Sequence, residues 1–421
     1  MKMKLTEDCP KGFLFVCLVF AGIIISACAP TSFHAPGYSF PRPVDTESKP
    51  IQYQEKKVYS FPGGISVDNQ FEGSRLNAAS LLNDSTLRIV VLPENEPINP
   101  SPWYAFRMTT TQTKRIWIQI DYSNYKHRYL PKWCRDGVNW ENISSPLQYV
   151  NQDSSQVLFS VDLVKDTVWI AAQDVVNSKR VNQWCEQISN EKKAVHLREG
   201  GRSVLGRNIP CLDIFHGSKS GKPLIVVLSR QHPPEVTGYF AMQKFVDEVL
   251  SGTALSQAFL DKYRVLVFPL MNPDGVDLGH WRHNAGGIDL NRDWAEYHQP
   301  ETRQVADFIV SESRRFNSKV LIGLDFHSTW YDIFYTNVDS MNWVLPGFKE
   351  KWLKGIKDNI PENFFRERPS GLGQPVTKGW FYTTFKAIGI TYEIGDDSPR
   401  ELLAEKGKIS AQVMMELLLS K

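Results

Sequence analysis

The chain has 421 residues, of which 42% are hydrophobic and 22% are charged, and its formal net charge at pH 7 is +2. These values are ordinary for a globular protein of two or three domains. The small net charge argues against nucleic acid as a partner.

The chain begins with a lysine-containing segment, residues 1–11, followed by the apolar run GFLFVCLVFAGIII at residues 12–25. This run is too short for a comfortable membrane span and is typical of an export signal. Small residues then precede Cys28, an arrangement that resembles the lipobox of bacterial lipoproteins. The resemblance implies that residues 1–27 are removed and that acylated Cys28 anchors an exported bacterial lipoprotein to a lipid membrane, on its periplasmic or cell-surface face. An ordinary cleaved signal peptide and a single anchor helix remain open as alternatives.

Residues 28–60 are rich in Pro, Ser and Thr and poor in aliphatic residues, which predicts a tether between the lipid and the folded part. Beyond this segment the chain keeps Cys134, Cys185 and Cys211. In an oxidising compartment three cysteines allow one disulfide and one leftover thiol, and the sequence does not select the pair.

Residues 61–199 contain short alternating runs bounded by Asn, Asp, Pro or Gly. The clearest are STLRIVVL, WYAFRMTT, RIWIQIDY, QVLFSVDL and TVWIAAQ. Several short strands at this spacing predict an all-β sandwich domain.

From residue 200 to residue 421 the pattern changes to strands alternating with helices. The continuous apolar runs PLIVVLS, YRVLVFPL, VLIGLDFHS and ITYEIG are typical of strands covered on both faces. Between them, GYFAMQKFVDEVLSG and PETRQVADFIVSESRRF have the apolar spacing of helices. This order predicts an α/β domain.

His232 and Glu235 follow the first of these strands, with Pro233 and Pro234 between them. The prolines exclude a helix through the pair and predict a stiff loop. A second histidine, His327, lies at the end of VLIGLDFHS. Three ligands from two strand ends, with a fourth position left for water, are the pattern of a catalytic zinc site. The alternative for His232 and Glu235 alone is a hydrogen-bonded structural pair.

Further polar residues follow the apolar run that ends at Leu270. NPDG at residues 272–275 is predicted to be a turn. Arg282, Asn291 and Arg292 come next, and arginine forks suit a terminal carboxylate or a developing oxyanion. Glu393, in ITYEIG, is placed to act as the base for a metal-bound water.

In these features the chain resembles the zinc carboxypeptidase family typified by pancreatic carboxypeptidase A. The His-x-x-Glu loop, the NPDG turn, the run DLNRDW and the strand-end His and Glu follow the family order. Within the family, the chain is most similar to the cytosolic-carboxypeptidase branch, which has a β-sandwich before the catalytic domain. The resemblance implies an α/β fold with a mixed sheet covered by helices on both faces, preceded by the all-β sandwich.

The resemblance also implies one Zn²⁺ ion and a set of residue roles. His232, Glu235 and His327 bind the metal, Glu393 is the general base and later the general acid, Arg282 stabilises the oxyanion, and Asn291 and Arg292 hold the terminal carboxylate of the substrate.

Two residues keep a second interpretation. Asp289 occupies the place of a carboxylate that orients the first zinc histidine, or it caps a turn. Lys378 lies where family members read the terminal side chain, and a lysine there favours an acidic terminal residue; the alternative is a solvated loop lysine. The chain departs from carboxypeptidase A in having no clear counterpart of that enzyme's mobile tyrosine before Glu393.

The function predicted from the sequence is a zinc metallocarboxypeptidase acting on the C-termini of peptides or proteins, cell-wall stem peptides among them. Two alternatives stay open. One is a zinc amide or acyl hydrolase acting on small acylated amino acids, and the other is a catalytically dead binding lipoprotein.

Overall fold

The computed structural model of the chain describes residues 33–362 and 364–420. The predicted signal segment and the predicted lipidation site, Cys28, lie outside these residues. Among the helices described, we find none with the length and apolar character needed to cross a membrane.

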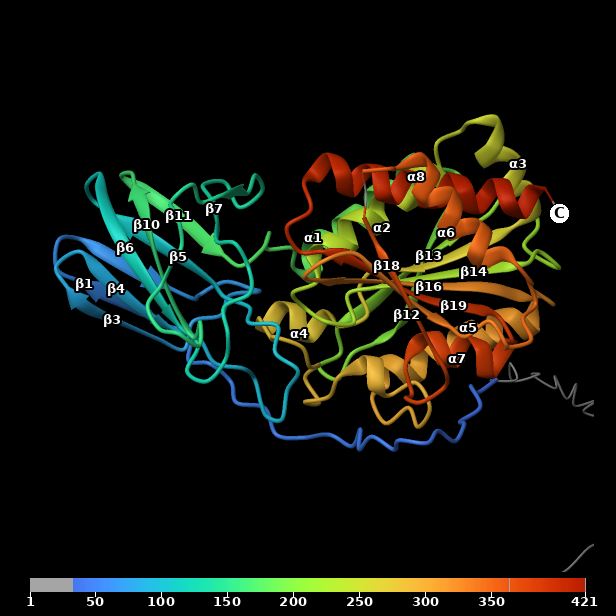
Figure 1. Cartoon of the computed structure of the whole chain (residues 1–421), viewed down its shortest axis with the longest axis horizontal. Coiled ribbons are helices and arrows are strands. Elements are labelled where there is room, and N and C mark those ends of the chain that lie inside the picture. The colour runs from blue at the N-terminus through green and yellow to red at the C-terminus, as the bar shows by residue number, and fades with distance from the viewer. Residues whose placement is uncertain (1–32, 363, 421) are drawn as a thin grey trace, which may run out of the picture. The chain divides into compact units, whose positions relative to one another are not determined.

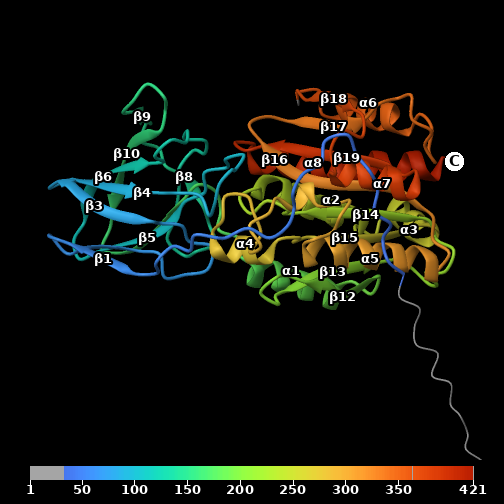
Figure 2. The same ribbon diagram turned by 90° about the horizontal axis from the view of Figure 1, so that it is seen from below.

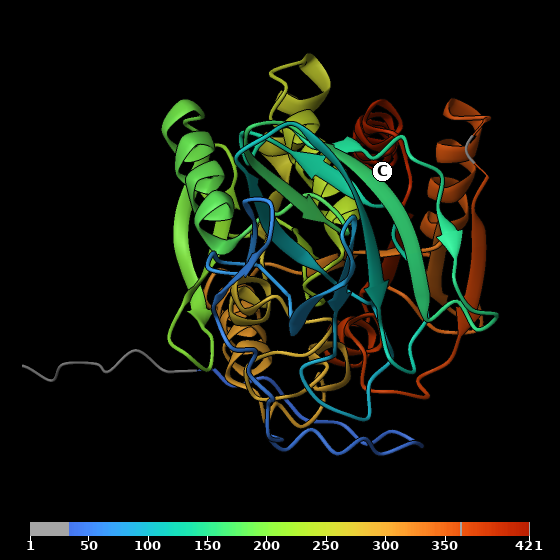
Figure 3. The same ribbon diagram turned by 90° about the vertical axis from the view of Figure 1, so that its left-hand side faces the viewer.

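Residues 58–171 form two sheets, which we call the β-sandwich (Figures 1 and 3). In spatial order the first sheet contains β1 (Val58–Phe61), β2 (Ile65–Asp68), β5 (Ala105–Thr110), β11 (Asp166–Ala171), β7 (Lys132–Cys134) and β8 (Glu141–Asn142). The second contains β3 (Ala78–Asn83), β4 (Thr86–Val90), β6 (Lys114–Asp121), β10 (Gln156–Leu163) and β9 (Gln148–Tyr149).

The alternating sequence explains how the two sheets pack. Along β6, Ile116, Ile118 and Ile120 are fully buried, while the residues between them face outward or are half-buried. Val67 and Phe106 from the other sheet belong to the same apolar cluster. Side chains alternate across a strand, so one face of each sheet supplies this shared core. The predicted β-sandwich is therefore present.

An eight-stranded mixed sheet forms the centre of the second region, residues 178–420, which we call the α/β domain. Its strands, in spatial order, are β12 (Val195–Arg202), β13 (Asn208–Ile214), β15 (Arg264–Phe268), β14 (Leu224–Ser229), β16 (Val320–Thr329), β19 (Ile388–Gly395), β17 (Ile333–Asn337) and β18 (Arg366–Ser370). β15, β14, β16 and β19 are parallel neighbours, whereas β12, β13 and β17 pair antiparallel.

Helices cover both faces of this sheet (Figures 1 and 2). They are α1 (Ser178–Glu191), α2 (Val236–Val249), α3 (Ala254–Lys262), α4 (Pro273–Leu278), α5 (Pro300–Arg315), α6 (Phe348–Asn359), α7 (Thr377–Phe385) and α8 (Arg400–Leu419). Ile225 and Val227 of β14 pack into the core shared with α2 and α8, and Val226 packs into the core shared with α5 and α7. A strand buried on both faces needs a continuous apolar run, which is why LIVVL predicted it correctly.

The domain boundary predicted at residue 199 is wrong. β12 crosses this boundary and pairs with β13, and α1 packs against the core of the α/β domain. β12 is an edge strand of mixed polarity, HLREGGR, so its sequence does not resemble the apolar central strands.

In the predicted tether, residues 28–60, the described residues pack against the folded part of the chain. Residues 33–57 follow the α/β domain without regular structure, and β1 begins at Val58. Phe33 packs against the core shared with α5 and α7, the Thr46 hydroxyl donates to Asp293 (2.6 Å), and the Tyr297 hydroxyl donates to the Pro36 carbonyl (2.9 Å). A low aliphatic content therefore did not prevent this segment from docking through backbone and hydroxyl contacts.

Two smaller predictions are corrected as well. NPDG is the start of a helix: the Asn272 side chain accepts from the Gly275 amide, and α4 begins at Pro273. Cys134, Cys185 and Cys211 are buried free thiols, so the disulfide that the sequence allowed among these three residues is not formed.

Candidate metal centre and active site

The predicted site residues gather at one edge of the mixed sheet. β14, β16 and β19 are parallel neighbours, so their carboxyl ends meet at the same edge. His232 and Glu235 follow β14, His327 is near the end of β16, and Glu393 is near the end of β19.

The loop between β14 and α2 holds its shape through local geometry. Arg230 adopts a left-handed φ of 56°, and Pro233 and Pro234 delay the helix until Val236. Glu235 is thus fixed at the start of α2. Gly238 in the first turn of α2 allows close approach to β16, because a Cβ there would lie 2.3 Å from the His327 carbonyl oxygen.

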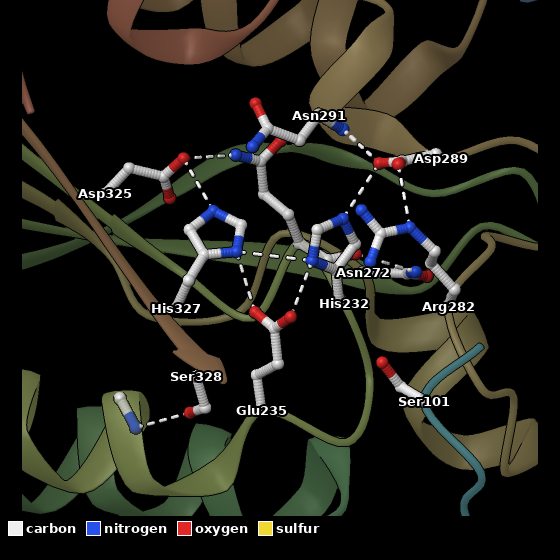
Figure 4. Close-up of polar contacts among 12 residues, drawn as sticks. Ser101, His232, Glu235, Asn272, Arg282, Asp289, Asn291, Asp325, His327 and Ser328 are labelled. Carbon is white, nitrogen blue, oxygen red and sulfur yellow. Dashed lines mark hydrogen bonds and ion pairs between the residues drawn. The ribbon is translucent and has the colours of Figure 1, made fainter. Parts of the chain in front are cut away.

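His232, Glu235 and His327 form a converging buried triad (Figure 4). Glu235 Oε1 lies 2.8 Å from His232 Nδ1, and Glu235 Oε2 lies 2.7 Å from His327 Nδ1. The two Nδ1 atoms are 3.2 Å apart. Two imidazole nitrogens and a carboxylate aimed at one point are the ligand set of an open, catalytic zinc centre. The residues present therefore fit a single Zn²⁺ ion.

A carboxylate backs each imidazole on the side away from the triad (Figure 4). Asp289 Oδ1 lies 2.8 Å from His232 Nε2, and Asp325 Oδ2 lies 2.8 Å from His327 Nε2. Such partners keep the proton on Nε2 and leave Nδ1 free for a metal. Asp325 was not predicted, although strand alternation places residues 325 and 327 on the same face.

Glu393 is the neighbour of His327 in the sheet, where the two residues are register partners. Its Oε2 atom is buried without a hydrogen-bond partner. Burial raises the pKa of Glu393 to about 7, and the negative charge of Glu235 acts in the same direction. A carboxyl group poised near neutrality beside a metal centre suits acid–base work.

Arg282, Asn291 and Arg292 come together around Asp289. Arg282 Nε donates to Asp289 Oδ2 (2.8 Å), and Arg292 Nη1 lies 3.8 Å from the same oxygen. Asp289 also accepts from the Asn291 amide (2.9 Å) and caps the 3₁₀ turn η1 (Leu290–Arg292). Both interpretations of Asp289 are therefore met by its geometry: it contacts His232, and it caps a turn.

Residues 181–339 match the family model described as zinc carboxypeptidase. This match lies within the α/β domain, which is called the carboxypeptidase domain from here on. Its sequence relatives include cytosolic carboxypeptidase 2 of Xenopus tropicalis, 32% identical over 184 residues that make up 40% of this chain and 18% of the relative. Mouse cytosolic carboxypeptidase 6 is 22% identical over 66% of this chain and 56% of the relative. The chain thus spans less than two thirds of the length of these curated relatives.

Solved structures of similar fold cover both parts of the chain. A metallo-carboxypeptidase from Burkholderia cenocepacia has a TM-score of 0.71 at 17% identity, over 85% of this chain and 99% of that protein. A metallo-carboxypeptidase from Pseudomonas aeruginosa, solved with (2-guanidinoethylmercapto)succinic acid, has a TM-score of 0.66 at 18% identity, over 84% and 98%. The shared fold confirms the predicted α/β class with a preceding β domain.

Within the triad, the surrounding charges favour the ionised forms of Glu235 and His327. Burial would raise the pKa of Glu235, but His232 and His327 outweigh it and hold that pKa well below its usual range. Burial would lower the pKa of His327, but Asp325 and Glu235 raise it well above its usual range. A divalent cation would take the place of the protons that these groups otherwise share.

Lys378 is not the solvated loop lysine of the second interpretation. It lies in the first turn of α7 and is 5% exposed. Its Nζ donates to Asn337 Oδ1 (2.9 Å) and to the Ser370 carbonyl (3.2 Å), and burial lowers its pKa to about 8. A buried ammonium without a carboxylate partner among the described residues suits an anionic ligand group.

Arg128 of the β-sandwich reaches the same edge and was not predicted. Its Nε donates to Asp396 (2.8 Å), three residues beyond Glu393, and its Nη2 donates to the carbonyl of Ser328 (3.1 Å), directly after His327. Both side chains of the Arg128–Asp396 pair are under 10% exposed. No motif in the sequence marks such a contact, because its partners are 200 and 268 residues away.

Proposed function

We propose that this chain is a zinc-dependent metallocarboxypeptidase that hydrolyses the C-terminal peptide bond of its substrates. The observation that carries the proposal is the open three-residue centre of His232, Glu235 and His327 with the unpaired carboxyl of Glu393 beside it. The carboxypeptidase domain and its relatives support this reaction class.

His232, Glu235 and His327 would hold the metal, with Asp289 and Asp325 orienting the imidazoles. Bound Zn²⁺ supplies Lewis-acid polarisation of the scissile carbonyl and a water of lowered pKa. Every other role falls to groups of the chain.

Glu393 takes a proton from the attacking water and then delivers it to the leaving amine. Its raised pKa suits both steps, because the group neither holds nor releases the proton too strongly near neutral pH. Arg282 is held next to the triad by Asp289, from where its remaining donors stabilise the oxyanion.

Asn291 and Arg292 bind the terminal carboxylate of the substrate. The Asn291 Oδ1 atom accepts from the amide and the hydroxyl of Thr377, which fixes the orientation of its side-chain amide. Arg292 keeps part of its guanidinium exposed, so that its planar fork remains available for bidentate binding.

The direct test is mass spectrometry of peptide mixtures, including cell-wall stem peptides, incubated with the purified protein. We expect loss of single C-terminal residues, abolished by a chelator and restored by one equivalent of Zn²⁺. A parallel panel of N-acyl amino acids separates this activity from that of a small-substrate amide hydrolase. If the zinc-loaded protein cleaves no peptide, the proposal fails.

Lys378 would select an acidic terminal residue, because its buried ammonium has one donor beyond its two hydrogen bonds. Peptides that differ only in a terminal Glu or Gln measure this selection. Lys378→Met is expected to lower kcat/KM for the Glu peptide roughly ten- to hundredfold and to leave the Gln peptide within about twofold. Equal losses on both peptides would contradict a role in recognition.

We also propose that the protein is an exported bacterial lipoprotein held to a membrane by acylated Cys28. The support is the lysine-containing start, the apolar run and the small residues before Cys28. Fractionation of cells that express the full chain tests it: the protein is expected with the membranes, and Cys28→Ala is expected to stay uncleaved and unacylated. Membrane association of Cys28→Ala as a processed, lipid-free chain would contradict the proposal.

A further inference from the structure

The loop that carries Arg282, between α4 and η1, is held by one carboxylate of the β-sandwich. Glu94 is fully buried and accepts hydrogen bonds from three successive backbone amides. Its Oε2 accepts from Trp281 (2.7 Å), and its Oε1 accepts from Arg282 (2.9 Å) and His283 (2.7 Å). Hydrogen bonds to an ionised carboxylate are about twice as strong as neutral ones, so this is a strong and well-directed clamp.

The residues on either side of Arg282 strengthen this clamp. Trp281 is fully buried within the core cluster of the β-sandwich, and its indole nitrogen donates to the Trp103 carbonyl (3.0 Å). Asn95 contacts His283 Nδ1 through its Oδ1 (2.6 Å) and donates to the Gly287 carbonyl (3.1 Å). The loop is therefore anchored in the sandwich through residues 281, 283 and 287.

The side chain of Arg282 points away from Glu94 and toward the triad. Its guanidinium donates to Asp289, whose second oxygen contacts His232 (Figure 4). The backbone amide of Arg282 is thus bound by the β-sandwich, while its side chain belongs to the metal centre. Any shift of the Glu94 contact moves the base of the Arg282 side chain.

We propose that Glu94 is a positioning residue of the active site and that the β-sandwich serves catalysis by fixing the direction of Arg282. The inference rests on the proposed function, since it assigns Arg282 the oxyanion. Glu94 touches no reacting atom; it acts through the backbone of residues 281–283. A group that must meet developing charge has to be placed to within a fraction of an ångström, and a displacement of about 1 Å can cost on the order of a hundredfold in rate.

A double-mutant cycle between Glu94 and Arg282 tests the proposal. Glu94→Gln keeps the size of the side chain but presents an amide to one of the three N–H donors. We expect kcat/KM to fall roughly 10- to 100-fold in the wild-type background and by less than about threefold in an Arg282→Met background. The zinc content is expected to stay at one equivalent in all four proteins.

Ile118→Ala is the matched control for lost stability, because Ile118 is fully buried in the β-sandwich core, outside the loop and its clamp. It is expected to lower the unfolding midpoint and to leave kcat/KM unchanged below the melting range. If Glu94→Gln retains activity within twofold, or loses the same factor in both backgrounds, Glu94 does not position Arg282.

Hydrogen exchange provides a readout that needs no substrate. In Glu94→Gln, or in Glu94→Asp if the first variant does not fold, the amides of residues 281–283 are expected to exchange at least about tenfold faster, while those of β14 keep their rates. Unchanged exchange in the loop would overturn the proposal. A different result would be faster exchange in the variant together with a wild-type protein that cleaves no peptide. That result would refute the proposed function, but it would still show that Glu94 holds the backbone of residues 281–283.

Discussion

The carboxypeptidase domain and the β-sandwich contribute to the same site in different ways. The carboxypeptidase domain presents the functional groups, including the metal triad and Glu393, at the ends of parallel strands. The β-sandwich contributes Glu94, which binds the backbone of the loop that carries Arg282. It also contributes Arg128, which binds the Ser328 carbonyl next to His327 in β16 and the side chain of Asp396 after β19. On the proposed function, one region supplies the groups for catalysis, and the other restricts the movement of the backbone segments that carry them.

The sharpest way to separate the two contributions is to remove a chemical group without disturbing the fold. Glu393→Gln is expected to keep one equivalent of zinc and a wild-type unfolding midpoint, and to lose on the order of a thousandfold or more in kcat, since the base acts only in the chemical step. Metal analysis and steady-state kinetics check this result. Turnover close to wild type would remove Glu393 from the mechanism.

Removing Arg128 tests the contribution of the β-sandwich next to His327, at the ends of β16 and β19. Arg128→Met leaves Asp396 buried without its charged partner, which typically costs about 3–5 kcal/mol of unfolding free energy. Urea unfolding measures the loss. Adding Asp396→Asn to the variant is expected to recover part of it, because a neutral amide tolerates burial better than an unpaired carboxylate. A fully stable Arg128→Met variant would show that the pair does not hold the two regions together.

Glu301 sharpens the comparison because it contacts the Arg282 loop from α5 of the carboxypeptidase domain, whereas Glu94 contacts it from the β-sandwich. Its carboxylate accepts from Asn284 (3.0 Å) of that loop and from the Val204 amide (3.2 Å). Burial raises the pKa of Glu301 to about 7, whereas Glu94 has a lowered pKa, because His280 and Arg75 outweigh the effect of its burial.

The sign of the Glu301 effect follows from its raised pKa. Between pH 4.5 and 7 the folded protein holds a proton that the unfolded chain releases, so stability falls as the pH rises through this window. The loss is about 3 kcal/mol at most. Glu301→Gln should therefore gain stability relative to wild type from pH 5 to pH 8 in urea unfolding. A difference between the two proteins that does not vary with pH would show that Glu301 has an ordinary pKa.

Asp289 tests whether a carboxylate of the carboxypeptidase domain itself contributes to zinc affinity through its contact with His232. Asp289→Asn keeps a side chain that can cap η1 but weakens the contact to His232, so zinc affinity is expected to fall roughly 10- to 100-fold. Competition with a chromophoric chelator measures the affinity. Asp325→Asn is the matched variant at His327, and a loss in one variant only would show that the two imidazoles are held differently.

The features that were predicted correctly from the sequence are those that a local pattern of residues can encode. The buried strands β14, β15, β16 and β19 appear as apolar runs because both of their faces are covered. The triad was found because His232 and Glu235 share one proline-stiffened loop and His327 ends a strand. The edge strand β12 was assigned to the wrong domain, since about half of its residues are exposed and it carries no continuous apolar run.

The residues that were missed act over long distances in the chain. Glu94 lies 188 residues before the amide of Arg282, and Arg128 lies 268 residues before Asp396. In a single sequence each is an ordinary charged residue in a loop. Only the docking of the two regions turns them into buried partners, and no periodicity or spacing encodes that docking.

The smallest effect is expected from the Arg115–Asp162 pair, which is the natural control for Arg128–Asp396. Both are arginine–aspartate pairs that involve the β-sandwich, but the side chains of Arg115 and Asp162 are 65% and 64% exposed. Water and salt screen such a pair, so its contribution to stability is close to nothing. Asp162→Asn should keep the unfolding midpoint, the zinc content and kcat/KM of the wild type. A loss comparable to that of Arg128→Met would mean that burial is not what separates the two pairs, and that the sandwich stabilises the site through its surface as well as through its contacts.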